Sequence, residues 1–425
     1  MKERALIVGY VWPEPNSSAA GLRIAQLLAS LRRAGYEVHF ACAAALSEHQ
    51  LDLASVDVTA HQVQLNCSSF DEFVAQLNPA VVIFDRFVTE EQFGWRVANT
   101  CPDALRILDT EDLHSLRAAR EALLKAQLKK GGDVGPVLAN DADLFGAMRQ
   151  SDMILREVAA IFRCDLTLMI SDKEISLLQE YFSVPSQLLY HLPFMVEPPH
   201  NEWPDYSHRQ HFVTIGNFRH APNWDAVLWL KQSIWPLLRT KVPGAELHIY
   251  GSYPPKKATQ LTNPKEKFFV KGWADDALQV VANARVLLAP LRFGAGIKGK
   301  LMDAMLTATP SVATAIASEA MAGDEPWPGA VANSASDFAQ YAAQLYSQEP
   351  SWKTASQQAE KLLRAHYLRE RLSPLWLAHL SQLRGDLVRH RRDNFLGAMF
   401  QYHAARSTEF MSRWIEVKSR VQLSD

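Results

Sequence analysis

The stretch from Phe293 to Pro310, FGAGIKGKLMDAMLTATP, combines the groups that bind a nucleotide diphosphate. Gly294 and Gly296 let the main chain come close to a ligand, because glycine has no Cβ. A helix that begins directly after such a turn offers unpaired N–H groups and a partial positive charge to an anion. Lys298 and Lys300 add full positive charges. The stretch is therefore a candidate diphosphate site.

The neighbouring elements predict how these groups are held. The run from Arg285 to Pro290 is typical of a buried strand, and the apolar residues that follow recur at helical spacing, so the glycines lie on a strand-to-helix turn. Asp303 would lie one to two turns into the helix, within reach of a ribose hydroxyl. A glycine turn before an ordinary helix is the alternative, since such a turn alone is a weak motif.

This region resembles a known family over about residues 211–320. The runs APLRFGAGIKGKLMDAMLTATPSVAT and VTIGNFRHAPNWDAVLWLKQSIWPLLRTKVPGAELHIYG are similar to the donor half of the retaining glycosyltransferases of family four, or group 1. The likeness is fainter over the first half of the chain. It implies an α/β fold of the GT-B type, in which two Rossmann-like domains face each other across a cleft.

The chain departs from the family at two places. The family commonly carries two glutamates eight positions apart; Asp303 stands at the second, which holds the ribose, and Ala295 at the first. A subgroup with a similar glycine-rich loop also lacks the first glutamate. The family's Arg and Lys pair has no clear match in residues 216–220. The basic residues that could substitute are Arg219, His220, Arg292 and Lys298.

The resemblance implies a donor site and a catalytic set. Stabilisation of the leaving diphosphate would come from the loop N–H groups, Lys298 and Arg292. Glu319, in the turn after a later strand, would approach the donor sugar, and capping of a following helix is the alternative. The donor-binding residues are expected to be Gly294, Gly296, Lys298, Asp303, Glu319, Gly216, Arg219 and Gly21.

A second cluster lies at residues 109–117, where three carboxylates, an imidazole and a guanidinium follow a buried strand within nine residues. It is similar to the strand-end D-T-x-D-x-H segment of the same family. The resemblance implies that His114 orients the donor sugar or positions an acceptor hydroxyl, and that Asp112 accepts a hydrogen bond or a proton. The alternative is structural: Asp109 or Thr110 caps a helix, and the other charged groups pair along it.

The first half alternates strands with helices, as in a doubly wound sheet. Residues 5–9 form a strand, a helix follows with its apolar residues on one face, and residues 36–42 form the next strand. The resemblance places the first loop at the cleft, with Asn16 and Gly21 beside it. Ser17 or Ser18 could instead only cap the helix.

We therefore expect four segments along the chain. Residues 1–196 form an acceptor domain, and the proline-rich residues 197–210 form a linker. Residues 211–370 bind the nucleotide sugar. Residues 371–425 form a helical extension that crosses back to the first domain, as the resemblance implies.

Composition limits the function classes. Lys plus Arg total 44 and Asp plus Glu total 46, so the net charge of −2 offers no case for general nucleic-acid binding. The four cysteines have no CxxC spacing, which indicates buried thiols in a reducing compartment. We expect no metal and no cofactor; Asp141-Ala-Asp143 matches a metal motif of another fold and is interpreted as chance. With no long apolar segment, we expect a cytoplasmic protein, and peripheral contact with the membrane's inner face is compatible with this.

Two basic regions could meet a partner. The helix expected at residues 117–130 is locally basic, and residues 131–136 after it read as a mobile connection. The tail from Arg384 to Arg420 carries eight basic and four acidic residues with interleaved aromatic side chains. This tail could contact an acceptor, an RNA, a membrane surface or a second subunit, or simply pack with a solvated basic face.

The function expected from the resemblance is glycosyl transfer in glycan biosynthesis. A nucleotide-diphosphate sugar would donate a hexose, without a metal and with retention, to an acceptor such as a glycan, a lipid-linked glycan or a protein. Two alternatives stay open. One is a non-catalytic nucleotide-sugar sensor or partner subunit, motivated by Ala295 and the missing basic pair. The other is a sugar-nucleotide epimerase on the same fold.

Overall fold

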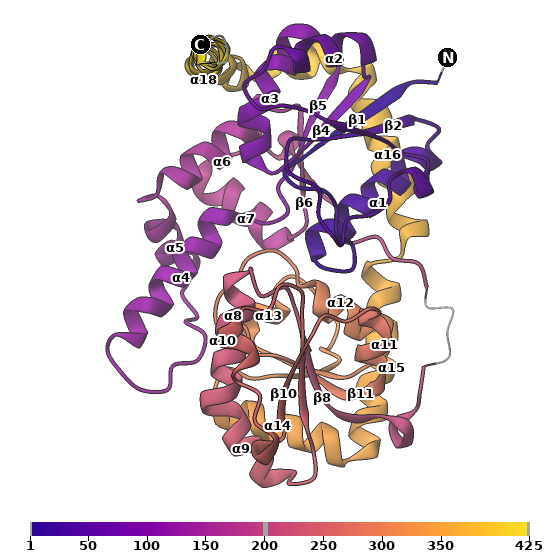
Figure 1. The fold of residues 1–425 in the computed structure, drawn as a ribbon, viewed down its shortest axis with the longest axis vertical. Helices are drawn as coiled ribbons and strands as arrows, with labels where there is room; N and C mark the ends of the chain where they lie inside the picture. Colours follow the sequence, from indigo (N-terminus) through magenta and orange to yellow (C-terminus); the bar gives the residue numbers. More distant parts are fainter. Residues whose placement is uncertain (1, 199–202, 423–425) are drawn as a thin grey trace.

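The chain forms two α/β domains, one above the other in Figure 1, each built on a parallel sheet. The computed structural model describes residues 2–198 and 203–422, with side chains throughout except at 403–405 and 422. The predicted linker at 197–210 therefore lies partly outside the described residues, as does the end of the predicted extension. The α/β class and the pair of Rossmann-like domains predicted from the sequence are confirmed.

The first domain has a seven-stranded sheet in the order β3-β2-β1-β4-β5-β6-β7. Its strands are short apolar runs buried on both faces, as expected where helices cover both sides of a parallel sheet. Leu6 and Val8 of the first strand pack into one core, and Ala5 and Ile7 pack into the core on the opposite face. The strands are β1 (Arg4–Gly9), β2 (Glu37–Cys42), β3 (Thr59–Gln62), β4 (Val81–Asp85), β5 (Leu105–Asp109), β6 (Leu166–Met169) and β7 (Leu189–His191).

Helices cover both faces of this sheet. Several begin with a side-chain cap: Ser18 accepts a hydrogen bond from Gly21 N, and Ser171 accepts one from Glu174 N. The helices are α1 (Ala19–Arg33), α2 (Ser69–Leu77), α3 (Phe87–Thr100), α4 (His114–Leu128), α5 (Asp141–Met148), α6 (Asp152–Arg163) and α7 (Asp172–Phe182).

The second domain repeats the plan with six strands in the order β10-β9-β8-β11-β12-β13. The strands are β8 (Gln210–Ile215), β9 (Leu247–Tyr250), β10 (Phe268–Gly272), β11 (Ala284–Ala289), β12 (Ser311–Ala313) and β13 (Gly329–Val331). The helices are α8 (Ala221–Trp229), α9 (Trp235–Lys241), α10 (Lys256–Thr259), α11 (Ala277–Asn283), α12 (Gly299–Leu306), α13 (Ala315–Ser318), α14 (Ala335–Ser347) and α15 (Glu349–His366). A π-helical stretch, Leu230–Ile234, joins α8 to α9.

The chain then returns to the first domain, where α16 (Arg369–Gly385) packs against α1 (Figure 1). Trp376 is fully buried, and its indole N–H donates to Ser30 Oγ at 2.9 Å. Two more helices follow, α17 (Leu387–Asp393) and the long α18 (Phe395–Gln422).

Two local predictions were wrong. The segment 131–136 is not a free connection, because Asp133 Oδ1 accepts hydrogen bonds from Trp229 Nε1 at 3.0 Å and Ser233 Oγ at 2.7 Å in the second domain. The turn predicted at residues 317–319 belongs largely to α13.

Candidate functional site

The carboxyl ends of the strands in the two sheets meet between the domains. Gly296 lies so close to the loop after β5 that a Cβ on it would stand 2.9 Å from Asp112 Cβ. A Cβ on Gly299 would stand 2.9 Å from Ala19 Cβ, at the start of α1. Proteins with open α/β sheets bind ligands at the loops that follow the carboxyl ends of the strands. Here both domains contribute such loops.

The predicted glycine turn lies between β11 and α12. Gly296 has a φ of +62°, a conformation that other residues adopt at a cost, and the contact with Asp112 leaves no room for a side chain. Ala295 packs into the apolar core of the first domain, at 7% exposure. The turn is therefore held against the opposite domain by packing as well as by hydrogen bonds.

Lys298 stands directly before α12 and folds back over the turn. Its Nζ donates to Gly296 O at 2.6 Å and to Ala295 O at 3.2 Å. Burial lowers the pKa of Lys298 to about 8, although the nearby Glu319 carboxylate acts in the opposite direction. Within the described residues, the N–H groups of Gly299 and Lys300 donate no hydrogen bond, so the helix start keeps the unpaired donors expected of an anion site.

Asp303 and Lys300 lie on the same side of α12, three positions apart. Burial raises the pKa of Asp303 to about 7, and Lys300 opposes this. No described side chain or N–H group donates a hydrogen bond to the Asp303 carboxylate. Lys300 instead donates to Asn223 Oδ1 at 2.9 Å. The position of Asp303 is compatible with the predicted ribose contact, which stays a prediction.

Glu319 forms an ion pair across the domains. The Arg120 guanidinium, on α4, donates to both of its carboxylate oxygens at 2.8 and 2.6 Å, and also to Gly294 O at 2.8 Å. Arg120 is 5% exposed, so the pair is largely shielded from solvent. Glu319 does lie beside the glycine turn, and its predicted contact with a donor sugar stays a prediction.

Glu174 is a site residue that the sequence did not reveal. Its carboxylate, on α7, accepts hydrogen bonds from Gly296 N at 2.6 Å and Leu113 N at 3.3 Å, and the side chain is fully buried. Burial raises the pKa of Glu174 to about 8, helped by the charge of Asp112 and opposed by the bond from Gly296. Glu174 thus joins the glycine turn to the loop that holds Asp112.

Replacing Glu174 with Gln should remove a pH dependence of stability. The folded pKa lies above the ordinary value of 4.5, so Glu174 takes up a proton more readily in the folded chain. The contribution of Glu174 to the free energy of unfolding is therefore largest in acid. This contribution is lost as pH rises toward about 8, by up to about 1.4 kcal/mol per pH unit. Between about pH 5 and pH 8, the thermal midpoint of the Gln variant should rise relative to the parent.

Glu180, exposed on the same helix, provides the matched control. Glu180→Gln removes a carboxylate without touching the turn. If the thermal midpoints of the Glu174 and Glu180 variants change in parallel with pH, the buried Glu174 carboxyl makes no contribution to pH-dependent stability.

Arg292 is already paired inside the second domain. It donates to the two oxygens of Asp225 at 2.9 and 2.5 Å and to Val134 O of the first domain at 3.0 Å. Its guanidinium also lies 5.7 Å from the centroid of the Trp229 ring. Arg292 can therefore act on a ligand only from a fixed position.

The cluster at residues 109–117 lies opposite the glycine turn. Arg117 pairs with Asp112, and His114 Nε2 is 3.5 Å from Asp112 Oδ1. Burial lowers the pKa of His114 to about 4, so its ring is neutral at pH 7. For Asp112, burial acts to raise the pKa, but Arg117, His114 and His220 together outweigh it and the pKa is lowered.

The capping alternative for this cluster is wrong. No side chain at Asp109 or Thr110 caps α4; Glu157, on α6, accepts from the N–H groups of His114 and Ser115 at 2.6 and 3.1 Å. Asp109 is fully buried and pairs with Arg23 at 2.9 Å. The Asp109 carboxylate therefore takes its partner from α1 and does not cap α4.

The remaining predicted residues border the same cleft. Ser17 Oγ lies 2.8 Å from Ser252 Oγ of the second domain, while Ser18 caps α1. A Cβ on Gly21 would lie 2.4 Å from the Glu14 carbonyl, so local packing alone requires this glycine. The other two are in the loop after β8: Gly216, where a Cβ would stand 2.7 Å from the Asn223 amide, and Arg219, which stacks 3.6 Å from the Tyr253 ring centroid.

Comparison with a family model agrees with the resemblance seen in the sequence. Residues 209–348 match the model described as "Glycosyl transferases group 1". This region contains the glycine turn, α12 and Glu319. No curated protein matches the chain in sequence.

Solved structures show the GT-B fold over most of the chain. Sucrose-phosphate synthase from Thermosynechococcus elongatus superposes with a TM-score of 0.64 at 13% identity, covering 90% of this chain and 99% of that one. Anabaena HepE in complex with UDP and glucose superposes with a TM-score of 0.66 at 10% identity, covering 89% of this chain and 99% of that one. A glycosyltransferase from Rickettsia africae superposes with a TM-score of 0.63 at 11% identity, covering 90% of this chain and 99% of that one. The predicted two-domain architecture is thus confirmed.

Proposed function

We propose that this protein is a glycosyltransferase that moves a sugar from a nucleotide-diphosphate sugar to an acceptor, with retention of configuration. The observation that carries the proposal is the glycine turn after β11. There, unpaired N–H groups at the start of α12 and the Lys298 ammonium lie where the loops of the two parallel sheets meet. The family match over residues 209–348 and the UDP bound in HepE support a nucleotide-sugar donor.

The diphosphate is proposed to bind at the turn, with Asp303 holding the ribose. When the glycosidic bond breaks, negative charge grows on the leaving diphosphate. Donors that already point at this charge stabilise the transition state without reorganising. Lys298 is assigned this role directly, because it sits at the turn itself. Arg292 would add a fixed positive field, since its guanidinium is held by Asp225.

The donor sugar is proposed to lie between the turn and the cluster at residues 109–117. A neutral His114 ring can donate to or accept from a sugar hydroxyl. Asp112, kept ionised beside Arg117, can accept from a hydroxyl or stabilise positive charge on the sugar. The acceptor would enter from the first-domain side. The residues assigned here need no metal, and within the described chain no group of three or more metal-ligating side chains occurs.

His114→Ala should lower kcat far more than it raises the donor KM. A group used mainly in the transition state changes turnover with little effect on ground-state binding. We expect a loss of about 100-fold, at the lower end for a positioned catalytic side chain. The check is steady-state kinetics, with folding confirmed by circular dichroism. An unchanged kcat would leave His114 a packing residue against Phe87.

The direct test of the function uses the full chain. A thermal-shift panel of UDP, GDP, dTDP and CDP sugars identifies the donor, and product analysis with and without glycan, lipid-linked glycan or protein acceptors follows. Transfer requires an acceptor. Conversion of the sugar nucleotide without an acceptor would mean an epimerase, and binding without turnover would mean a sensor or partner subunit.

No helix within the described residues is long and apolar enough to cross a bilayer.

A further inference from the structure

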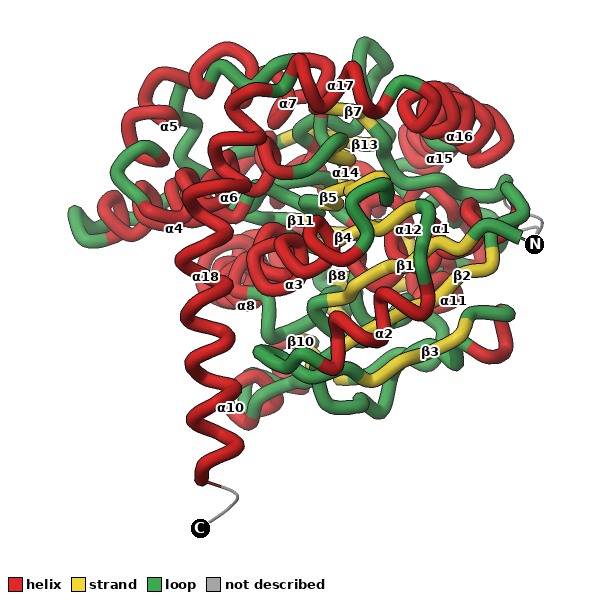
Figure 2. Tube along the Cα trace, turned by 90° about the horizontal axis from the view of Figure 1, so that it is seen from above, coloured by secondary structure: helices red, strands yellow, loops and turns green. Residues whose placement is uncertain are grey.

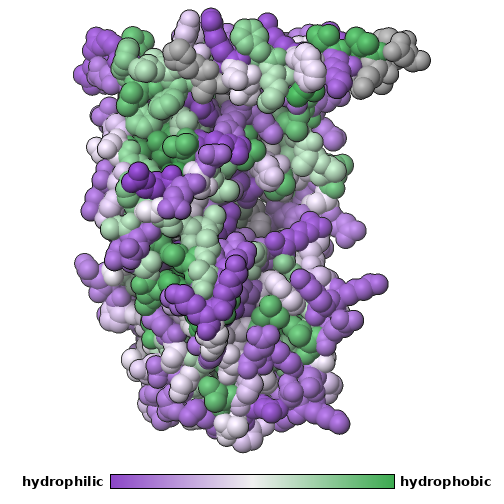
Figure 3. All heavy atoms as spheres, turned by 90° about the vertical axis from the view of Figure 1, so that its left-hand side faces the viewer, coloured by the Kyte–Doolittle hydropathy of each residue, from purple (hydrophilic) through white to green (hydrophobic). Residues whose placement is uncertain are grey.

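Helix α18 projects from the first domain, beyond α3 and α6 (Figure 2). It is 28 residues long, which corresponds to about 42 Å at 1.5 Å per residue. In Figure 3 it extends past the body of the molecule at the upper right. Much of its surface therefore faces away from the rest of the chain.

The face of α18 that touches the protein is mostly polar. Arg96 donates to Ser412 Oγ at 3.0 Å, and Ser68 Oγ donates to Glu416 Oε1 at 2.7 Å. Gln401 Nε2 donates to Arg163 O at 3.0 Å. A helix on the surface of a globular protein usually turns its apolar stripe toward the core. Here polar side chains make most of the contacts, and Phe400 packs inward against Phe162.

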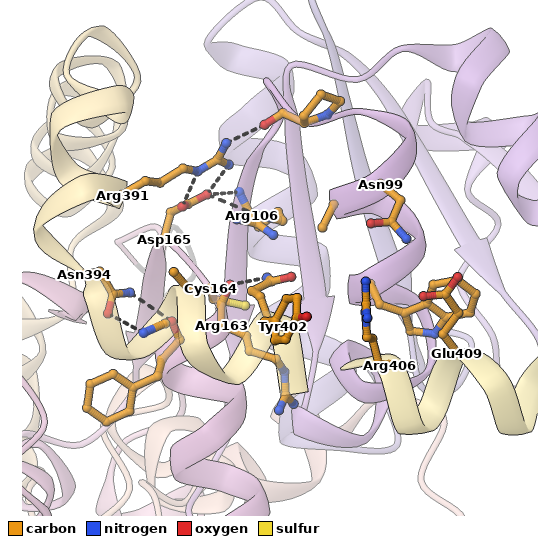
Figure 4. A pocket seen from close by; sticks show the side chains of 17 residues that line it. Asn99, Arg106, Arg163, Cys164, Asp165, Arg391, Asn394, Tyr402, Arg406 and Glu409 are labelled. Atoms are coloured by element: carbon orange, nitrogen blue, oxygen red, sulfur yellow. Dashed lines mark hydrogen bonds and ion pairs between the residues drawn. The ribbon is translucent and has the colours of Figure 1, made fainter. Parts of the chain in front are cut away.

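A cavity of about 660 Å³, lined by both polar and apolar side chains, lies under the start of this helix, as Figure 4 shows. Asp165, on its wall, pairs with Arg391 of α17 at 2.7 Å and lies 3.7 Å from Arg106. Asn394, between α17 and α18, donates to Phe162 O at 2.9 Å. These bonds fix which side of α18 is turned inward.

The outward face carries a stripe of large apolar side chains at helical spacing. Phe410 is 63% exposed and Trp414 is 62% exposed. Tryptophan, with an apolar ring system and one N–H group, is favoured at the boundary between headgroups and acyl chains, and phenylalanine adds apolar surface that acyl chains can cover. The stripe consists of Phe395, Met399, Phe410, Trp414, Val417 and Val421.

The charged side chains of α18 also differ between its inward and outward faces. The helix has four basic and two acidic residues. The acidic side chains, Glu409 and Glu416, are 19% and 13% exposed, whereas their partners Arg413 and Arg420 are 64% and 70% exposed. Lys418 lies 5.1 Å from the centroid of the Trp414 ring. The exposed surface is therefore apolar with a positive border.

We propose that the outer face of α18 binds the surface of a bilayer that contains anionic lipids. The helix would lie in the plane of the interface, with the stripe among the acyl chains and the basic side chains at the phosphates. A second copy of the chain suits the face less well. Pairing two such helices along their stripes would bring the exposed basic side chains beside the stripes, Arg413 and Lys418 among them, close to those of the other copy.

The test is co-sedimentation of the full chain with phosphatidylcholine vesicles, with and without phosphatidylglycerol. Binding is expected only with the anionic lipid, and it should weaken as salt is added. Phe410→Ser combined with Trp414→Ser should weaken binding by roughly tenfold or more, because each loses a buried apolar side chain. Lys418→Gln should weaken it roughly fivefold.

Leu375→Ser is the matched control, since Leu375 is 59% exposed on α16 of the same domain, away from the stripe. It should bind like the parent, and unchanged circular dichroism should show that all variants are folded. Absence of binding to the anionic vesicles would overturn the proposal, and so would a double variant that binds like the parent. Sedimentation equilibrium without vesicles shows whether the stripe instead joins two copies; dimers that the double variant abolishes would also overturn it.

Discussion

Lys298→Ala is expected to lower kcat about 100- to 1000-fold, the usual loss when one group that stabilises developing charge is removed. Lys298 Nζ already lies at the turn, 2.6 Å from Gly296 O, so it meets the leaving diphosphate without a large movement. The donor KM should also rise, because the ammonium attracts the diphosphate in the ground state. Steady-state kinetics with the donor found in the thermal-shift panel measures both.

The pH dependence of kcat offers a second readout. Burial lowers the pKa of Lys298 to about 8, so the ammonium is lost as pH rises through that value. The kcat of the parent should fall there. Lys298→Arg keeps its charge at high pH and should retain kcat above about pH 8, even if the altered shape lowers it at pH 7.

Lys361→Ala, at an exposed position on α15, controls for the loss of a lysine. The role assigned to Lys298 would be wrong if its Ala variant, shown to be folded, turned over like the Lys361 variant.

Asp303→Ala is expected to act chiefly on the donor KM. The carboxylate is assigned to the ribose, remote from the bond that breaks, so its loss should leave kcat within a few-fold of the parent. A charge-assisted hydrogen bond contributes about 1.5–3 kcal/mol, which corresponds to a KM about 10- to 150-fold higher. Calorimetric titration with the nucleoside diphosphate measures the same loss without turnover.

Asp303 also predicts a proton linked to binding. Burial raises its pKa to about 7, and hydrogen bonds from a ribose favour the ionised form. Donor binding should therefore release a proton below about pH 7, and affinity should fall as the pH falls. Asp303→Asn should abolish this dependence. If affinity for the diphosphate is unaffected by Asp303→Ala, and Lys298→Ala leaves kcat unaffected as well, the donor does not bind at the glycine turn.

The stability of the closed cleft depends on groups that lie far apart in the chain. Arg120 and Glu319 are separated by 199 positions, and Glu174 and Gly296 by 122. Both contacts join the glycine turn to the first domain. Because this turn would also hold the donor, domain opening and donor binding would use the same few residues.

Much of the fold was predictable because its signals are local. Buried parallel strands are apolar runs, and helices repeat their apolar residues every three to four positions. These patterns predicted β1, α1, β2, β5 and the strand-to-helix turn from β11 to α12. Short or weakly apolar strands such as β3, with its sequence TAHQ, carry no such signal and were not predicted.

The site was predictable only in part. The glycines, the lysines and Asp303 of the stretch 293–310 indicate a nucleotide site by their types and spacing. Close approach of the main chain to a ligand and positive charge both depend on residues that are near one another in the sequence. Their partners are not local. In the sequence, Glu174 looks like any other polar residue of α7. Nothing in the sequence around Arg292 indicates its bond to Asp225.

The sequence by itself determined the alternation of strands and helices, the glycine turn and the basic, aromatic composition of the C-terminal tail. Only the tertiary structure decided that Glu174 and Arg120 hold the turn, and that α18 turns its apolar stripe outward. The physical reason is that periodicity reports which residues share a face of an element. What that face meets depends on how elements dock, and docking is set by contacts between residues hundreds of positions apart.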